Sequence, residues 1–333
     1  MTAQSEPLQY LGDPDLQPKP NRQARVFPYL PKPSLIEAVN LAIALDRPLL
    51  IQGEPGCGKT LLARAIAYEF SQRYLKGKAE WPFFSWNVKS NSTAQEGRYT
   101  YDALGKLRDA QLVGTPQLEQ FLDDTQRQKL IDRLSNPEGY IKWGPLGLAL
   151  QECDRRPILL IDEIDKADID FPNDLLCDLE EGYFIVDETQ QQIPEKPGAN
   201  KPIVIITSNQ ERELPEAFLR RCLFFYLPFP DETHLRQIVE CHFPRPDRAD
   251  IIKNAIAKFL EIRSKGRSRS QGKQASTSEL LDWLSVLIDD SEAAAKIEKV
   301  ASDPAQLGIL LKSRADLDRV LRKPPAQPKS EPS

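Results

Sequence analysis

The residues best suited to chemistry in this sequence form a glycine-rich stretch that ends in a lysine and a threonine. It runs from Gly53 to Thr60 and reads Gly-Glu-Pro-Gly-Cys-Gly-Lys-Thr. Glycines let the backbone turn tightly, so that its N–H groups converge on phosphate oxygens at the start of a helix. The lysine adds a positive charge for the β- and γ-phosphates, and the threonine hydroxyl can ligate Mg²⁺. The stretch therefore predicts a phosphate-binding loop and a bound nucleoside triphosphate.

The neighbours of this loop support the prediction. The apolar run Pro48 to Ile51 precedes it, and a segment of helical character, Leu61 to Phe70, follows it. A strand, a loop and a helix in this order are the context that a phosphate loop needs. Both neighbours disfavour the alternative, a chance pattern in a turn rich in glycine and proline. We expect the following residues to bind the nucleotide: Gly53, Glu54, Pro55, Gly56, Cys57, Gly58, Lys59, Thr60, Leu61 and Asp162.

Two acidic residues, Asp162 and Glu163, follow the apolar run Ile158 to Ile161. An uninterrupted run of this kind predicts a strand that is buried on both faces of a parallel sheet. Its carboxyl end lies at the edge where open α/β sheets bind ligands. We expect Asp162 to hold Mg²⁺ together with Thr60, and Glu163 to polarise the attacking water as general base. Taken alone, these two acids together with Asp165, Asp168 and Asp170 would suit the start of a helix better, but the upstream phosphate loop favours catalysis.

Composition narrows the class of protein. The net charge of −5 and the pI near 5.4 argue against a protein that coats nucleic acid. The five cysteines are odd in number and form no Cys-x-x-Cys pair, which is typical of a reducing compartment. The N-terminus shows no secretory signal, and no apolar stretch approaches the roughly 18 residues of a membrane span. These features predict a soluble, cytoplasmic protein.

Buried strands alternate with helical segments up to about residue 230. This alternation predicts an α/β fold with a doubly wound, parallel, five-stranded sheet. The expected strands are Pro48–Gln52, Phe83–Val88, Ile158–Ile161, Ile203–Thr207 and Leu223–Leu227. Beyond residue 230 the helical segments are Glu232–Cys241, Ala249–Ile262, Ser278–Leu287 and Asp289–Val300. They predict a small, all-helical lid domain.

The domain boundaries follow from these patterns. Residues 26–230 are expected to form the α/β domain and residues 231–322 the helical domain. The polar, proline-rich ends, 1–25 and 323–333, are predicted to be disordered. Within the α/β domain we expect a long polar insertion at about 90–140. Alternating apolar and polar residues around a turn predict a hairpin at about 181–193.

Four motifs occur in the order and spacing of AAA+ ATPases. They are the phosphate loop, Leu159–Ala167, Ile206–Asn209 and Leu214–Cys222. Over about Phe27 to Leu287 the chain resembles this family, and its MoxR-like branch in particular. The expected hairpin before Asn209, the expected insertion and the stretch Arg98–Leu107 support that branch.

The resemblance implies roles for further residues. Asn209 matches sensor 1, whose amide contacts the γ-phosphate or the attacking water; its alternative role is a turn-forming asparagine. Arg221 matches the arginine finger that a neighbouring subunit inserts to neutralise transition-state charge, and Arg220 is the second candidate. Paired arginines at a helix end can also simply bind terminal carbonyls. The sensor 2 arginine is replaced by Ser278. Other candidates for that role are Lys273, Arg267 and Arg269.

The resemblance also implies a reaction and partners. ATP and Mg²⁺ would bind at subunit boundaries of a homo-oligomeric ring, a hexamer by resemblance. Hydrolysis would remodel or mature a protein client, for which a von Willebrand factor A domain is one candidate. Two alternatives stay open: a nucleic-acid-linked motor that resembles the restriction NTPase McrB, with GTP in place of ATP, and a nucleotide-dependent scaffold in a signalling or defence assembly. The basic run Arg263–Lys273 is more typical of a solvated loop than of a nucleic-acid site.

Overall fold

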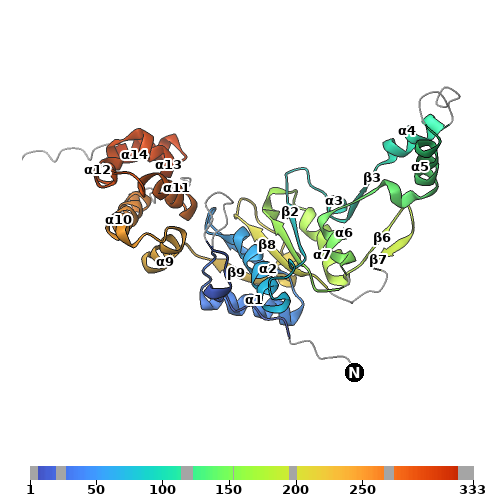
Figure 1. Ribbon diagram of the computed structural model, residues 1–333, viewed down its shortest axis with the longest axis horizontal. Coiled ribbons are helices and arrows are strands. Elements are labelled where there is room, and N and C mark those ends of the chain that lie inside the picture. The colour runs from blue at the N-terminus through green and yellow to red at the C-terminus, as the bar shows by residue number, and fades with distance from the viewer. Residues whose placement is uncertain are drawn as a thin grey trace, which may run out of the picture. The chain divides into compact units, whose positions relative to one another are not determined.

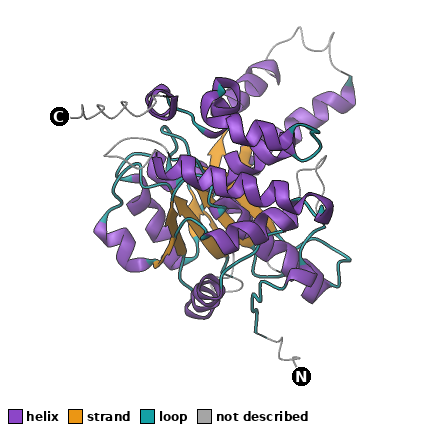
Figure 2. Cartoon of the chain, turned by 90° about the vertical axis from the view of Figure 1, so that its left-hand side faces the viewer, coloured by secondary structure: helices purple, strands orange, loops and turns teal. Residues whose placement is uncertain are grey.

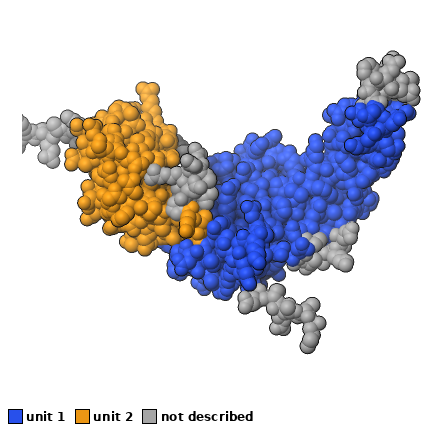
Figure 3. All heavy atoms as spheres, viewed as in Figure 1, with its two compact units in different colours: residues 1–16, 31–52, 60–226 blue, residues 17–30, 53–59, 227–333 orange. Residues whose placement is uncertain are grey.

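The computed structural model describes residues 7–19, 28–113, 123–152, 154–194, 201–265 and 274–321 of the chain. The chain divides into two compact units, shown in different colours in Figure 3. The first unit consists of Met1–Leu16, Pro31–Gln52 and Thr60–Tyr226, and the second of Gln17–Leu30, Gly53–Lys59 and Leu227–Ser333. Each unit contains a hydrophobic core of its own.

The first unit is built on a five-stranded sheet with the strand order β2-β5-β8-β1-β9 (Figure 1). These strands are β1 (Leu49–Gly53), β2 (Phe83–Asn87), β5 (Ile158–Asp162), β8 (Ile203–Ser208) and β9 (Leu223–Leu227). Strands β2, β5, β8 and β1 pair in parallel. Figure 2 shows the strands in orange and the helices that flank them in purple. The predicted α/β fold with a five-stranded parallel sheet is confirmed.

The central strands of this sheet are buried along their length. All six residues of β8 are buried, and so are Ile158–Ile161 of β5. Isoleucine, leucine and valine dominate these strands, as expected where helices cover both faces of a parallel sheet. The carboxyl ends of the strands are level, because Ile51 lies opposite Thr207 and Ile161 lies opposite Ile206. The residues that end these strands therefore meet at one edge.

The α-helices of the first unit are α1 (Pro33–Leu45), α2 (Lys59–Leu75), α3 (Ala94–Arg98), α4 (Ala103–Val113), α5 (Asp124–Ser135), α6 (Pro145–Gln151), α7 (Phe171–Glu181) and α8 (Glu216–Arg221). Short 3₁₀ turns are η1 (Pro14–Leu16), η3 (Pro137–Tyr140) and η4 (Ile164–Lys166). Helix α6 packs on β2 and β5. In the parts of the chain that the structure describes, no helix has the length and apolar character to cross a membrane.

Two small antiparallel ribbons extend from the sheet. Strand β3 (Tyr99–Tyr101) pairs with β4 (Ile141–Trp143), and β6 (Phe184–Val186) pairs with β7 (Gln191–Ile193). In Figure 1 helices α4 and α5 lie beyond these ribbons, away from the sheet. Asp109 on α4 is buried and accepts hydrogen bonds from Tyr140 Oη at 2.9 Å and Arg133 Nη1 at 3.2 Å. This buried carboxylate holds α4, α5 and η3 together.

The second unit is helical beyond β9. Its α-helices are α9 (Glu232–His242), α10 (Ala249–Lys265), α11 (Thr277–Leu287), α12 (Ala293–Lys299), α13 (Pro304–Leu310) and α14 (Arg314–Leu321), with 3₁₀ turns η5 (Pro246–Arg248) and η6 (Val300–Ser302). Trp283 is fully buried in their core and donates from Nε1 to Gln306 Oε1 at 2.9 Å. Helix α12 begins later than predicted, because the Asp290 carboxylate accepts the N–H of Glu292 and closes a turn there. The predicted helical C-terminal region is confirmed.

The prediction that residues 1–25 are disordered is wrong for residues 7–19. Tyr10 is fully buried, its N–H donates to Asn40 Oδ1, and its carbonyl accepts from Asn40 Nδ2, both at 2.8 Å. The composition of this segment gave no sign of order, because the partner that orders it lies 30 residues further along the chain. Residues 1–6, 20–25 and the predicted tail 323–333 lie outside the described residues.

A buried carboxylate on α2 fixes the same segment. Glu69 is fully buried and accepts hydrogen bonds from Leu11 N at 2.7 Å and Asp13 N at 3.2 Å. Burial raises the pKa of Glu69, and the backbone hydrogen bonds oppose that rise by stabilising the ionised form. The N-terminal segment thus supplies donors that water would supply to an exposed glutamate.

We expect Glu69→Ala to release this segment. The change leaves two backbone N–H groups without an acceptor, which costs about 1–3 kcal/mol of the free energy of unfolding. Urea denaturation measures that loss, and hydrogen exchange of the Leu11 and Asp13 amides shows whether the segment opens. Glu69→Gln keeps one acceptor oxygen without a buried charge, so its loss should be smaller. The control is Glu37→Ala, at an exposed position of α1; unchanged amide protection in Glu69→Ala would contradict the assignment.

Candidate active site

The glycine-rich loop joins β1 to α2, as its sequence predicts. Gly56 and Gly58 have φ angles of +72° and +92°. These values lie in the left-handed region, where a side chain strains the backbone and glycine does not. The tightly turned loop ends where α2 begins. The first N–H groups of α2 have no partner within the helix. Such an arrangement binds anions.

Lys59 is the first residue of α2 and is only 5% exposed. Its Nζ donates to the carbonyl oxygens of Gly53 at 2.8 Å and Glu54 at 2.9 Å. The ammonium group is therefore held inside the loop that precedes it. The positive charge of Lys59 thus lies inside the loop that the sequence predicts to bind phosphate.

Residues Gly53–Lys59 of the loop belong to the second unit, and other residues of that unit lie close to them. A Cβ on Gly56 would overlap the side chain of Ser276 and would lie 3.2 Å from Ser278 Oγ. A Cβ on Gly58 would lie 3.1 Å from the ring of Tyr29. Ser278, the residue at which the resemblance predicts a sensor 2 arginine, therefore lies beside the loop. The other sensor 2 candidates lie outside the described residues: Arg267, Arg269 and Lys273.

Cys57 in this loop is a partly buried thiol. Burial raises its pKa, while the charge of Lys59 lowers it by a smaller amount. The pKa of the neighbouring Tyr29 hydroxyl is also raised, first by burial and then by Cys57. The thiol is therefore less ionised than an exposed cysteine, and its place in the loop is that of a small packing residue.

The carboxylate of Asp162, at the end of β5, brings two hydroxyl groups together. Thr60 Oγ1 donates to Oδ1 and Oδ2 of Asp162 at 2.9 and 3.1 Å. Thr207 Oγ1, at the end of β8, donates to Oδ1 at 2.5 Å. A carboxylate beside a threonine hydroxyl is a set of hard oxygen donors of the kind that Mg²⁺ prefers. The two predicted metal ligands, Thr60 and Asp162, are thus in contact.

Glu163 follows in a strained conformation. Its φ and ψ are 60° and 50°, a left-handed conformation that costs a residue other than glycine about 1–3 kcal/mol. The N–H of Glu163 donates to Thr207 Oγ1 at 2.8 Å. Its carboxylate accepts from Asn209 Nδ2 at 2.9 Å through Oε1 and from Lys166 Nζ through Oε2. The structure therefore brings the predicted base Glu163 and the predicted sensor Asn209 together.

Asp165 connects this turn to the loop after β8. It is 2% exposed and accepts the N–H groups of Asn209 at 3.1 Å and Glu211 at 2.8 Å. These hydrogen bonds fix the backbone that carries the Asn209 amide.

The hydrogen bond to Glu163 raises the pKa of Lys166, so Lys166 keeps its positive charge through the neutral pH range.

The two candidate arginines at the end of α8 have partners within the chain. Arg220 Nη2 lies 2.6 Å from Glu216 Oε1, one helical turn away, and both side chains are exposed. Arg221 Nε lies 2.5 Å from Glu180 Oε1 on α7. Among the described residues, neither arginine hydrogen-bonds to Asp162 or Glu163. The structure of one chain therefore does not bring these arginines to the acidic residues.

Comparisons with known proteins decide the family. A scan against protein families matches residues 48–222 to the AAA domain (dynein-related subfamily), which is 175 of the 333 residues. The chain belongs to this AAA family. A search of the curated proteins finds no match. Among solved structures, that of C. elegans PCH-2 matches with 14% identity and a TM-score of 0.39, over 85% of this chain and 65% of that one. The chain thus spans about two thirds of the PCH-2 structure.

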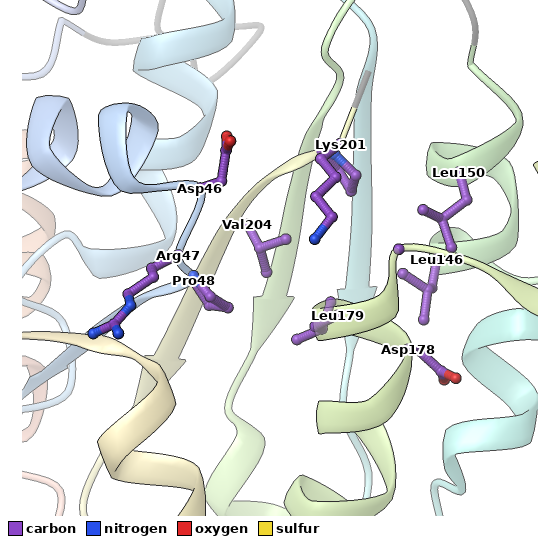
Figure 4. A pocket seen from close by; sticks show the side chains of 11 residues that line it. Asp46, Arg47, Pro48, Leu146, Leu150, Asp178, Leu179, Lys201 and Val204 are labelled. Carbon is purple, nitrogen blue, oxygen red and sulfur yellow. The ribbon is translucent and has the colours of Figure 1, made fainter. Parts of the chain in front are cut away.

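Two cavities lie at opposite edges of the AAA sheet. At the carboxyl edge, a cavity of about 420 Å³ is lined by Val88, Lys89, Ser90, Asp165, Lys166, Glu211 and Arg212. At the amino ends of β1 and β8, Figure 4 shows a pocket between Pro48, Val204 and Leu179 with Arg47 and Lys201 at its rim. That pocket has about 20 Å³, room for about one water molecule. Of these two cavities, the larger lies at the sheet edge that carries Asp162 and Glu163, and none of its lining residues belongs to the glycine-rich loop.

The sequence analysis gave no role in the candidate site to three residues that orient its side chains. Thr207, Asp165 and Lys166 orient Asp162, Asn209 and Glu163. Their position in the sequence could have identified them, because each one ends or follows a predicted strand at the carboxyl edge of the sheet. Polar side chains at such positions are candidates for orienting a site even where they do not contact the ligand.

Replacing Thr207 tests how far the arrangement of Asp162 and Glu163 at the carboxyl edge of the sheet depends on one hydroxyl group. Thr207→Val keeps the shape but removes the donor to Asp162 and the acceptor of the Glu163 N–H. We expect a loss of about 1–3 kcal/mol in the free energy of unfolding, measured in urea. Thr207→Ser keeps the hydroxyl and should lose less, and Thr100→Val, at an exposed position, should have little effect. Equal losses for valine and serine at position 207 would show that packing alone matters.

Proposed function

We propose that the chain is a MoxR-like AAA+ ATPase that binds ATP with Mg²⁺ and hydrolyses ATP between the subunits of a ring. The observation that carries this proposal is the position of Glu163, whose carboxylate is oriented by Asn209 and Lys166. The N–H of Glu163 donates to Thr207 Oγ1, and Thr207 Oγ1 donates to the carboxylate of Asp162. The same carboxylate accepts from Thr60. A base, a metal-binding pair and an amide donor at one sheet edge are the groups that phosphoryl transfer to water requires.

In this proposal the loop binds the triphosphate. Backbone N–H groups of the loop and the start of α2 receive the phosphate oxygens, and Lys59 contributes its positive charge. Thr60 and Asp162 would hold Mg²⁺, which when bound neutralises charge on the β- and γ-phosphates. The family supports nucleotide binding in general terms; ATP rather than GTP is part of the proposal.

The hydrolytic step is assigned to Glu163 and Asn209. The Glu163 carboxylate accepts a proton as water attacks the terminal phosphorus; the bond from that phosphorus to the bridging oxygen breaks, and ADP and phosphate leave. Asn209 orients the carboxylate or the water through its amide. The Asn209 backbone is fixed by Asp165, so its amide is presented in one direction. Such preorganisation lowers the cost of reaching the transition state.

Arg221 is assigned as the arginine finger of a neighbouring subunit. Its side chain is 45% exposed and its ion pair with Glu180 is half-exposed, so the contact can exchange for another at little cost. Arg220 is bound along its own helix to Glu216, as a structural surface residue would be. An arginine that acts in a neighbouring site requires a ring, for which six subunits are expected from the resemblance.

The client is assigned by class only. We propose a protein that is remodelled or matured, with a von Willebrand factor A domain as candidate, in a cytoplasmic setting. The alternative of a nucleic-acid motor is not favoured, because Arg263, the first cation of the basic run, is only 10% exposed and is bound to Glu54. The scaffold alternative is not favoured either, since Glu163 and Arg221 are both present.

Two substitutions separate binding from hydrolysis. Lys59→Ala removes a charge that meets the ground-state phosphates, so triphosphate affinity should fall. Glu163→Gln keeps the phosphate contacts and removes the base, so binding should persist while turnover falls about 10²- to 10⁴-fold. Equilibrium binding and phosphate release are measured with both ATP and GTP.

Matched controls are available on the exposed surface. Lys78→Ala and Glu37→Gln each remove a charge at an exposed position and should retain wild-type binding and turnover. Hydrolysis at the wild-type rate by Glu163→Gln would remove Glu163 from the mechanism. A wild-type protein that binds neither ATP nor GTP would refute the proposed function altogether.

The two arginines are distinguished by separate substitutions. Arg221→Ala should leave nucleotide affinity nearly intact and lower turnover by about 10³-fold or more, because a finger meets charge only in the transition state. Arg220→Ala should lose only the exposed pair with Glu216, worth about 0.3–0.5 kcal/mol. Turnover, affinity and melting temperature are measured for both. Equal effects of the two substitutions would contradict the assignment.

Mixed assemblies then test action between subunits. Lys59→Ala subunits keep Arg221, and Arg221→Ala subunits keep the phosphate loop, so a mixture should recover part of the activity. Mass photometry with ATP and the Glu163→Gln variant shows whether a ring forms, and wild-type specific activity should rise with protein concentration. Mixed rings without recovery, or a fully active monomer, would reject the trans finger.

A further inference from the structure

Arg263, near the end of α10, is a cation of the second unit that is held by contacts on three sides. Its guanidinium carbon lies 3.6 Å from the centre of the Phe229 ring. Nη1 donates to the carbonyl of Ala275, and Nη2 forms an ion pair with Oε2 of Glu54 in the phosphate loop. Its side chain is 10% exposed, compared with 39% for Glu54. A planar group that is stacked on a ring and bound on two sides has little freedom to turn.

Glu54 is the one acidic residue of the glycine-rich loop Gly53–Thr60. A carboxylate in the second residue of a phosphate loop adds a negative charge where the proposed ligand carries several. Among the described residues, Arg263 is the only hydrogen-bond partner of that carboxylate. The contacts with Phe229 and Ala275 hold the guanidinium in place independently of Glu54. The arginine is thus built into the helical region and offers its charge to the loop.

We propose that Arg263 is a positioning residue that neutralises Glu54 and thereby keeps the phosphate loop receptive to a nucleoside triphosphate. The inference rests on the proposed nucleotide binding and adds a determinant of affinity that does not itself touch the phosphates. With the pair intact the net charge of the two side chains is zero. Without the arginine, an unpaired carboxylate repels the phosphates across a partly exposed site, where charge interactions are only partly screened.

The proposal predicts a series ordered by charge. Arg263→Gln leaves Glu54 unpaired and should weaken binding of a fluorescent ATP analogue with Mg²⁺ by about tenfold. Glu54→Gln leaves Arg263 unpaired and should tighten binding by roughly threefold to tenfold. The double variant Arg263→Gln, Glu54→Gln restores zero net charge and should bind within about twofold of wild type. Fluorescence titration of the full chain measures all four dissociation constants.

Two further measurements separate charge from structure. The loss in Arg263→Gln should be larger for the ATP analogue than for the corresponding ADP analogue, and it should shrink as salt is raised. If Arg263→Gln does not fold, as judged by circular dichroism, Arg263→Lys takes its place. A lysine keeps the charge without the planar fork, so the loss should be smaller, and Glu54→Gln should again reverse it. Arg236→Gln, which breaks an exposed pair with Glu240 on α9, is the matched control.

The outcomes discriminate between the inferences. If Glu54→Gln weakens binding as much as Arg263→Gln, and the double variant does not recover, the pair is only a structural brace and the proposal is overturned. If Arg263→Gln loses the same amount of triphosphate affinity at low and at high salt, the proposal is also overturned. If wild type binds no triphosphate, the proposed function fails and this inference fails with it. If wild type binds normally but the dissociation constants of the variants do not follow the order of their charges, this inference alone is rejected.

Discussion

The carboxylate of Asp162 is the group on which the arrangement of the sheet edge depends. It ends β5, and it accepts hydrogen bonds from Thr60 at the start of α2 and from Thr207 at the end of β8. A charged oxygen at the rim of a buried sheet is costly unless donors surround it, so these three elements are held to one geometry. The same Thr207 hydroxyl accepts the N–H of Glu163. The direction of the proposed base is thus set by the acid that precedes it.

Sequence patterns predicted the local features of this edge and missed the distant ones. Buried strands and the glycine loop are encoded in consecutive residues, so apolar runs and glycine spacing identified them. The order of residues 7–19 depends on Asn40 and Glu69, which no local pattern connects to Tyr10 or Leu11. The partnership of Arg263 with Glu54 spans 209 residues. Composition placed Arg263 in a basic solvated run, whereas packing on Phe229 removes most of it from solvent.

The roles of Arg220 and Arg221 were left open by the sequence for a physical reason. Both residues end α8, and helix-end arginines bind carbonyls, carboxylates or ligands with similar ease. Their present partners differ: one is on the same helix, and the other is on α7. Half-exposed ion pairs contribute about 0–1 kcal/mol, so neither contact fixes its arginine against competition from a more negative partner. In the proposed ring, the role of either arginine would depend on the groups that a second copy of the chain presents to it.

The surroundings of Glu163 indicate which oxygen would act as the base in the proposed reaction. Oε1 is bound by Asn209, whose backbone is fixed by the buried Asp165. Oε2 is bound by Lys166, whose side chain is 39% exposed. Each carboxylate oxygen keeps a second lone pair that can accept a proton, and the oxygen whose donor lies on a flexible, solvated side chain is the easier one for the attacking water to approach. Movement of Lys166 alone would free Oε2 while Asn209 keeps the carboxylate aimed, so the strained turn at Glu163 would be preserved through the proton transfer.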